Sequence, residues 1–144
     1  MSNNTIKRTL IGQLPLGADL YDSLTQIVQR ENITLGRITG IGATTHAVVG
    51  YYDQHEKKYN TIEFPGGLEI LSLDGNISIR DEKPFVHVHI LLSDAEGKVF
   101  GGHLFPGTKL WACEFTIDEI DGEPLVRAYD EKTGLWLWSN GNLI

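Results

Sequence analysis

Three of the five histidines occur close together in the sequence, at His87, His89 and His103. Three neutral imidazoles held on one rigid surface form a natural site for Zn²⁺ or another divalent metal ion. Such a set leaves the fourth position of a tetrahedral zinc open for water or a substrate, as in catalytic zinc sites. The sequence therefore predicts a metal site here, and the alternative is three histidines that simply face solvent on a half-exposed sheet.

The predicted site depends on a β-hairpin formed by residues 85–92 and 98–105. Side chains alternate across a strand, so the first two histidines point to one face and their apolar neighbours to the other. If the hairpin turns about Glu96, the second histidine lies opposite the third, and directly opposed residues share a face. A slip of one residue would turn the third histidine away, so the register is the critical expectation.

Other side chains are weaker candidates for chemistry. Glu69 and Glu114 lie within apolar stretches, where a carboxylate is a candidate general base or a hydrogen-bond partner of a ligating histidine. The alternative for both is an outward-facing side chain. Cys113 is expected to be a buried small hydrophobe rather than a nucleophile. His46 and His55 lie near predicted turns and are interpreted as surface residues.

Cupins also carry a His-x-His pair on a β-barrel, and they are an alternative interpretation of this pattern. Their motif has a glutamate ligand a few residues after the second histidine. The first glutamate after His89 is Glu96, which falls in the predicted turn. The match therefore fails at one metal ligand, and the cupin interpretation is not favoured.

One segment, at residues 19–31, has the pattern of an amphipathic helix. Its apolar positions recur at helical spacing and form one stripe, made by Leu20, Leu24, Ile27 and Val28. Asp19 can cap the first turn with its carboxylate, and Asp22 suits the positive end of the helix dipole. Asn32 is expected to end this helix.

Most of the remaining chain is predicted to form strands. They are expected at 5–14, 37–45, 47–53, 59–64, 68–73, 76–80, 85–92, 98–105, 108–120, 126–129 and 135–138. The segment 108–120 is expected to be the longest, and Asp74-Gly75 is predicted to be a turn or bulge. This pattern predicts an α+β fold, with a strongly curled, mainly antiparallel sheet of about seven or more strands packed with one principal helix.

Composition restricts the classes of function. The 144 residues, with one cysteine, predict a single domain over 1–144 without an intrachain disulfide. Neither a signal peptide nor an apolar run of the roughly 18 residues that span a bilayer is apparent, so a cytoplasmic protein without membrane contact is expected. The net charge is −7 and the twelve Lys and Arg residues are scattered, so direct nucleic-acid binding is not expected.

The sequence resembles the PPC (plants and prokaryotes conserved) family in an ordered set of stretches. They are Gly40-Ile41-Gly42-Ala43 with Gly50-Tyr51-Tyr52-Asp53, the run from Leu68 to Ser78, Pro84-Phe85-Val86-His87-Val88-His89, and Gly101-Gly102-His103-Leu104. The resemblance implies a sheet flanked by a helix, assembled as a homotrimer. It also implies that His87, His89 and His103 match the family's metal-binding histidines, which some bacterial and archaeal members use for zinc.

Plant members of this family carry an AT-hook before the domain and a Gly-Arg-Phe-Glu-Ile-Leu type segment within it. This chain lacks the AT-hook core Arg-Gly-Arg-Pro, and it has Gly67-Leu68-Glu69-Ile70-Leu71 in place of the second segment, without the arginine. A DNA-binding function taken from plant relatives would therefore rest on an element that this sequence lacks.

Two functions remain open from the sequence. The first is a trimeric zinc protein whose three histidines bind or transform a small molecule. The second is a non-catalytic regulatory or interaction module, which the absence of an obvious acid–base pair beside the histidines favours. Whether the protein is an enzyme is left undecided by the residues alone.

Overall fold

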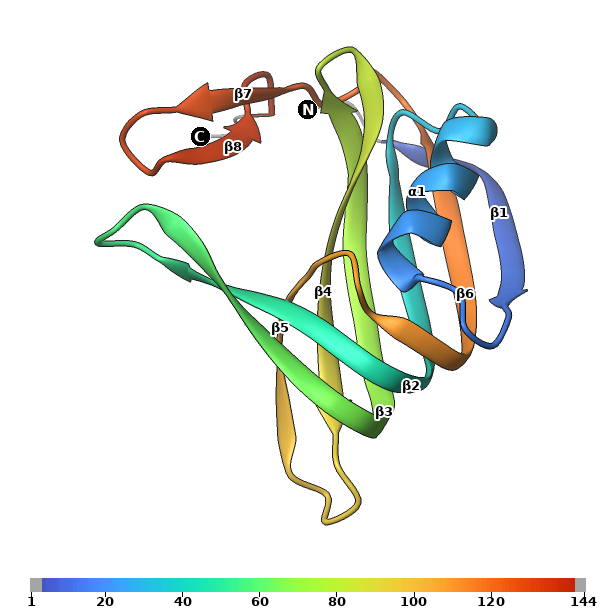
Figure 1. The fold of residues 1–144 in the computed structure, drawn as a ribbon. Coiled ribbons are helices and arrows are strands. Elements are labelled where there is room, and N and C mark those ends of the chain that lie inside the picture. The colour runs from blue at the N-terminus through green and yellow to red at the C-terminus, as the bar shows by residue number, and fades with distance from the viewer. Residues whose placement is uncertain (1–3, 142–144) are drawn as a thin grey trace.

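The computed structural model describes residues 4–141 (Figure 1). The one helix of this part, α1, spans Leu20–Arg30. The strands are β1 (Thr5–Leu14), β2 (Gly36–Asp53), β3 (Lys58–Arg80), β4 (Lys83–Ser93), β5 (Val99–Leu104), β6 (Lys109–Asp121), β7 (Arg127–Asp130) and β8 (Leu135–Trp138). No helix among the described residues is long and apolar enough to cross a membrane.

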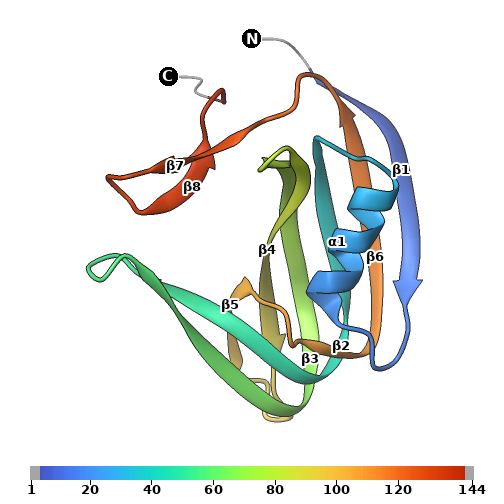
Figure 2. The same cartoon turned by 45° about the horizontal axis from the view of Figure 1, so that its top comes forward.

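The predicted α+β fold with a curled antiparallel sheet is confirmed. Six strands form one sheet in the order β1-β6-β2-β3-β4-β5, and every pairing in it is antiparallel. β5 also pairs with the far end of β2, so that β2, β3, β4 and β5 close into a barrel (Figure 2). β1 and β6 extend this barrel on the side where α1 packs.

The two longest strands replace shorter ones that the sequence pattern predicted. The segments 37–45 and 47–53 are parts of one strand, β2, which bends at bulges between Gly40 and Gly42 and between Thr44 and His46. The three segments expected at 59–64, 68–73 and 76–80 are one strand of 23 residues, β3. The expectation that 108–120 forms the longest strand was therefore wrong.

The predicted turn at Asp74-Gly75 is also wrong. Both residues lie inside β3, where Asp74 pairs with Thr39 on one side and with His89 on the other. Ladders on both sides hold this dipeptide extended, which overrides its local preference for a turn. The chain turns instead at Asp81 and Glu82, whose φ angles of 51° and 63° are left-handed.

α1 packs its apolar stripe against the barrel. Leu20, Leu24 and Val28 are fully buried, and the helix contacts β4, the strand that carries two of the three histidines. Asp19 caps the helix as predicted, because its carboxylate accepts a hydrogen bond of 3.1 Å from the backbone N–H of Asp22. The helix therefore supports the back of β4, opposite the face with the histidines.

The last two strands, β7 and β8, form a separate hairpin that folds back beside the barrel (Figures 1 and 2). Its turn meets the turn between β2 and β3. The hydroxyl of Tyr52 donates a hydrogen bond of 2.7 Å to the Thr133 carbonyl, and Lys57 Nζ donates one of 2.8 Å to the Glu131 carbonyl. These contacts tie together two segments that lie far apart in the sequence.

We predict that Gly75→Ala lowers the free energy of unfolding by about 1–3 kcal/mol, the usual cost of an overpacked site. A Cβ at Gly75 would lie 2.4 Å from the His87 carbonyl oxygen, so β4 would have to move. Urea unfolding checks this. Gly67→Ala is the matched control, because a Cβ there has its nearest neighbour 3.9 Å away. Equal stability of the two variants would contradict the prediction.

Candidate metal centre

The hairpin register predicted for the histidines is confirmed. β4 and β5 pair so that His89 lies opposite His103. Along β4, Val86, Val88, Ile90 and Leu92 are buried in the core, which turns His87 and His89 to the other face. His103 also pairs with Gly50 of β2, so the strand that carries the third histidine is held from both sides.

The three imidazoles converge closely enough to hold a metal ion. Ring centroids are 5.1 Å apart for His87 and His89, 5.0 Å for His87 and His103, and 5.5 Å for His89 and His103. One nitrogen from each ring can be chosen so that all three lie within 4.8 Å of one another. The nitrogens of a tetrahedral zinc site are about 3.4 Å apart, so small side-chain rotations complete the set.

The donor set fits a zinc ion in two further respects. His103 Nδ1 is buried and has no hydrogen-bond partner among the described residues, so one buried ring nitrogen has no protein group to satisfy it. Imidazole nitrogen is also a favoured ligand of Zn²⁺, and three such ligands leave one position open.

Burial keeps two of the imidazoles neutral. Desolvation, with smaller contributions from the positive charge of Arg127 and from the neighbouring His89, lowers the pKa of His87 to about 4. The pKa of His103 is likewise lowered to about 4, mainly by desolvation. A metal ion needs the lone pair of an unprotonated nitrogen, so the environment prepares these side chains as ligands at neutral pH.

Arg127 reaches the cluster from β7, a contact that no pattern in the sequence predicts. Its Nη2 lies 3.2 Å from His87 Nδ1. A guanidinium only donates hydrogen bonds, so this nitrogen of His87 accepts, and the proton of the neutral ring lies on Nε2. Metal binding by His87 therefore requires either a change of tautomer or a shift of Arg127.

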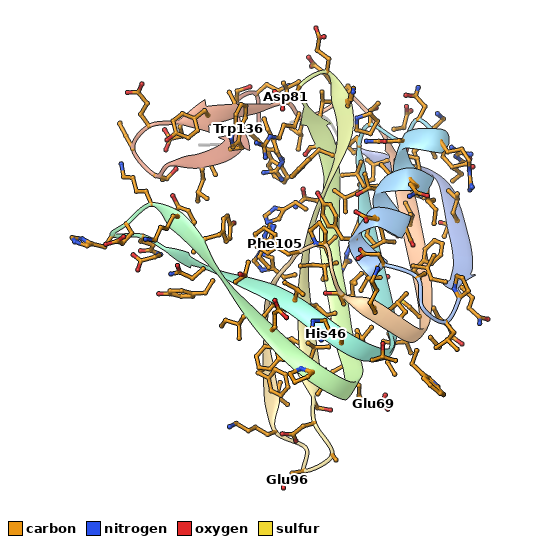
Figure 3. All side chains as sticks on the ribbon, in the orientation of Figure 1. His46, Glu69, Asp81, Glu96, Phe105 and Trp136 are labelled. Carbon is orange, nitrogen blue, oxygen red and sulfur yellow. The ribbon has the colours of Figure 1, made fainter. Side chains whose placement is uncertain are left out.

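An aromatic wall stands beside the third histidine. The ring of Tyr59 lies 4.9 Å from that of His103 and 5.3 Å from that of Phe105, measured between centroids. His87 and His103 line a cavity of about 580 Å³ together with this wall and the β7–β8 hairpin. In Figure 3, Trp136 lies on that hairpin and Phe105 lies below it, at the open side of the barrel.

The structure does not bring the two carboxylate candidates to the histidines. Glu69 and Glu114 are both exposed, which is the outward-facing alternative considered above. Each lines a hollow that contains none of the three histidines, Glu69 beside Trp111 and Glu114 beside Arg37. In Figure 3, Glu69 lies at the opposite end of the barrel from Trp136.

The remaining candidates behave largely as expected. Cys113 is buried, and burial raises the pKa of its thiol to about 11, which disfavours the reactive thiolate at neutral pH. His55 lies exposed in the turn between β2 and β3. His46 lies within β2 rather than near a turn, and its Nε2 is 3.4 Å from a carboxylate oxygen of Glu63.

The fold has similar solved structures from archaea and bacteria. A metal-containing protein from Archaeoglobus fulgidus is 42% identical, with a TM-score of 0.89 over 94% of this chain and 96% of its own. A plant- and prokaryote-conserved protein from Pyrococcus horikoshii is 34% identical, with a TM-score of 0.91 over 99% of both chains. A candidate DNA-binding protein from Bacteroides thetaiotaomicron is 26% identical, with a TM-score of 0.86 over 94% of both chains.

Curated relatives are much longer proteins. A bifunctional protein GlmU from Synechococcus sp. (strain JA-3-3Ab) is 31% identical over 96 residues, which are 66% of this chain. The chain spans 14% of the length of that relative and 18% of a second GlmU. The family model of the Plants and Prokaryotes Conserved (PCC) domain matches residues 1–121, a range that contains all three histidines. The chain belongs to the PCC domain family, as the resemblance in the sequence had implied.

Proposed function

We propose that the protein binds a divalent metal ion, zinc, through His87, His89 and His103, and that the bound metal holds or transforms a small molecule. The observation that carries this proposal is the convergence of the three ligand atoms within 4.8 Å on two paired strands. The name of the relative from Archaeoglobus fulgidus, a metal-containing protein 42% identical to this chain, supports it.

The chain's own residues prepare such a site. The closed barrel fixes the backbones of β4 and β5, so little backbone entropy is lost when the histidines are brought together around a metal ion. Burial keeps His87 and His103 neutral, and the adjoining cavity gives a small molecule access to the cluster. A bound zinc would supply a Lewis acid with an open coordination position at the edge of that cavity.

The alternative is a non-catalytic regulatory or interaction module. One observation favours it, because no Asp or Glu among the described residues lines the cavity that His87 and His103 share, which therefore has no carboxylate general base. A second hollow, lined by His87 and His89, does include the exposed Asp74, whose carboxylate is paired with Arg37 at 2.7 Å. The name of the relative from Bacteroides thetaiotaomicron, a candidate DNA-binding protein, also favours this alternative. The net charge of −7 disfavours direct contact with nucleic acid.

The same proposal includes assembly as a homotrimer. Aliphatic side chains lie on the outer face of the sheet, and Ile11, Ile41, Leu71 and Leu91 are 82%, 57%, 48% and 50% exposed. The ladders place Ile41, Leu71 and Leu91 at nearly the same level across the adjacent strands β2, β3 and β4, and Ile11 of β1 lies on the far side of β6. A row of exposed aliphatic side chains of this kind is typical of a protein–protein interface, and further copies of the chain can cover it.

We predict that the purified protein binds one equivalent of zinc per chain and that His103→Ala weakens this binding by about 100-fold or more. The loss of a residue that only hydrogen-bonds to a metal ligand weakens metal binding by about 10- to 100-fold, and the loss of a ligand itself is expected to cost more. Competition titration with a zinc chelator measures the affinity. His55→Ala is the control, since this histidine lies in an exposed turn. Unchanged zinc affinity in the His103 variant would refute the proposed site.

We predict that the metal-free protein loses stability as the pH falls from about 6.5 towards 5. His87 and His103 have folded-state pKa values of about 4 against an ordinary 6.5, so over this range the unfolded chain takes up protons that the folded chain does not. Urea unfolding as a function of pH measures the slope. His103→Gln should flatten it and His55→Gln should not, and equal slopes in both variants would contradict the assignment.

We predict that Leu91→Lys converts the assembled protein to monomers, because a charge would be buried at the proposed contact between copies. Light scattering coupled to size-exclusion chromatography gives the mass directly. Leu16→Lys is the matched control, since Leu16 is 64% exposed in the loop before α1. A wild-type protein that is monomeric at micromolar concentration would remove this part of the proposal.

A further inference from the structure

The cavity beside the histidines has an unusual charge for an acidic protein. It is bounded by the turn between β2 and β3, by β4 and by the β7–β8 hairpin. Its lining includes four cationic residues, Lys57, Lys58, Arg80 and Arg127, and no Asp or Glu. Lys58 is paired with Glu56 at 2.7 Å, so the positive charge that remains for a ligand comes from the other three residues, in a chain whose net charge is −7.

Arg127 is the clearest sign of a missing negative charge. It is only 9% exposed, and the partners of its guanidinium are neutral: Ser78 Oγ at 2.8 Å, Asn76 Oδ1 at 2.9 Å, the Trp136 carbonyl at 2.8 Å and the His87 ring. No carboxylate of the described residues forms an ion pair with it. Buried charges are normally paired, so a counter-charge is expected from outside the chain.

Arg80 places a second guanidinium at the same cavity with its donors largely free. Its Cζ lies 4.3 Å from the centre of the Trp136 ring and 5.3 Å from that of Phe85. Its one ion-pair contact is Nε to Asp81 at 3.6 Å, and the Asp81 side chain is 72% exposed. Among residues 4–141 no side-chain hydrogen bond holds Arg80, so its planar fork can bind a carboxylate with two N–H groups.

Most of the remaining wall is apolar. It includes Phe85, Leu104, Phe105, Leu135, Trp136 and Leu137. A cavity of about 580 Å³ suits a small organic molecule, and an apolar lining with few convergent polar groups is usual for such sites. The expected ligand therefore combines a negative charge with an apolar body.

We propose that this cavity binds a small organic carboxylate with an apolar, ring-sized body. Its carboxylate lies between Arg80 and Arg127, and its body lies against Phe105 and Leu137. This ligand site deepens the proposed function. It rests on that function only where the metal ion takes part, because His87 and His103, two of the three proposed metal ligands, line the same cavity.

The cavity favours a carboxylate over a phosphate group. Four hydrogen bonds already engage the five N–H groups of Arg127, so this residue contributes charge rather than a two-pronged contact. Arg80 is then the one guanidinium at the cavity with a free pair of N–H groups. Such a pair matches the two oxygens and the single charge of a carboxylate. A phosphate dianion would need further donors, and Lys57 and Lys58 already donate hydrogen bonds to the Glu131 carbonyl and to the Glu56 carboxylate.

The test is isothermal titration calorimetry with phenylacetate and with its neutral analogue phenylacetamide, on metal-free and on zinc-loaded protein. We expect phenylacetate to bind at least about tenfold more tightly, because the loss of one charged hydrogen-bonded contact costs about 1.4 kcal/mol or more. Inorganic phosphate should bind more weakly than phenylacetate. Equal binding of the two phenyl compounds, no binding of phenylacetate, or tighter binding of phosphate would each overturn the proposal.

A pair of variants separates the cavity from general surface charge. Arg80→Gln should weaken phenylacetate binding at least about tenfold and leave phenylacetamide binding unchanged. Its side chain is 32% exposed, so the variant is expected to fold, whereas replacement of the buried Arg127 could unfold the chain. Arg30→Gln, on a side chain that is 72% exposed on α1, is the matched control and should leave phenylacetate binding unchanged. Equal affinity for phenylacetate in both variants would refute the proposed ligand site.

Zinc uptake is measured separately on each sample, so the two proposals can fail independently. Protein that takes up zinc but does not prefer phenylacetate refutes the carboxylate site and leaves the metal site intact. Protein that prefers phenylacetate through Arg80 but takes up no zinc supports the carboxylate site and refutes the proposed metal function.

Discussion

Closure of the barrel through β5 is the constraint on which the histidine cluster depends. β5 pairs with β4 through His89 and His103, and with β2 through Gly50 and His103. The third histidine thus sits where two ladders meet, and it cannot slip along one strand without breaking its register with the other. Gly50 permits this closure, because a Cβ there would lie 2.1 Å from the ring of Phe105.

Electrostatics around the cluster follow from burial rather than from paired charges. Desolvation keeps His87 and His103 neutral, and it also lowers the pKa of Arg127, which the nearby Arg80 lowers further. A divalent cation at the histidines would add to this positive charge. An anion in the adjoining cavity would offset it, so the two proposed ligands favour each other's binding through simple Coulomb attraction.

The sequence predicted the parts of the fold that depend on short-range patterns. The alternation from Val86 to Leu92 correctly identified the face that carries His87 and His89, and the length of the hairpin gave the right partner for His103. The apolar stripe and the N-cap of α1 were also predicted correctly, because both depend on residues close together in the sequence. The continuity of β3 through Asp74-Gly75 was not predictable in this way, because ladders on both sides decide it and the dipeptide itself favours a turn.

The cavity could not be predicted from local sequence patterns either, because residues far apart in the sequence form it. Its cationic wall joins Arg80 at the end of β3 with Arg127 of β7, and no spacing rule connects these residues. The histidines lie within the part of the chain that the family model matches, 1–121, whereas Arg127 and Trp136 lie beyond it. The hairpin side of the cavity wall therefore lies outside the matched segment that carries the three histidines, whereas Arg80 and Phe105 lie within it. Substitution of a hairpin residue such as Leu137 is therefore expected to alter the wall of the proposed ligand pocket without disturbing the two ladders that hold the three imidazoles together.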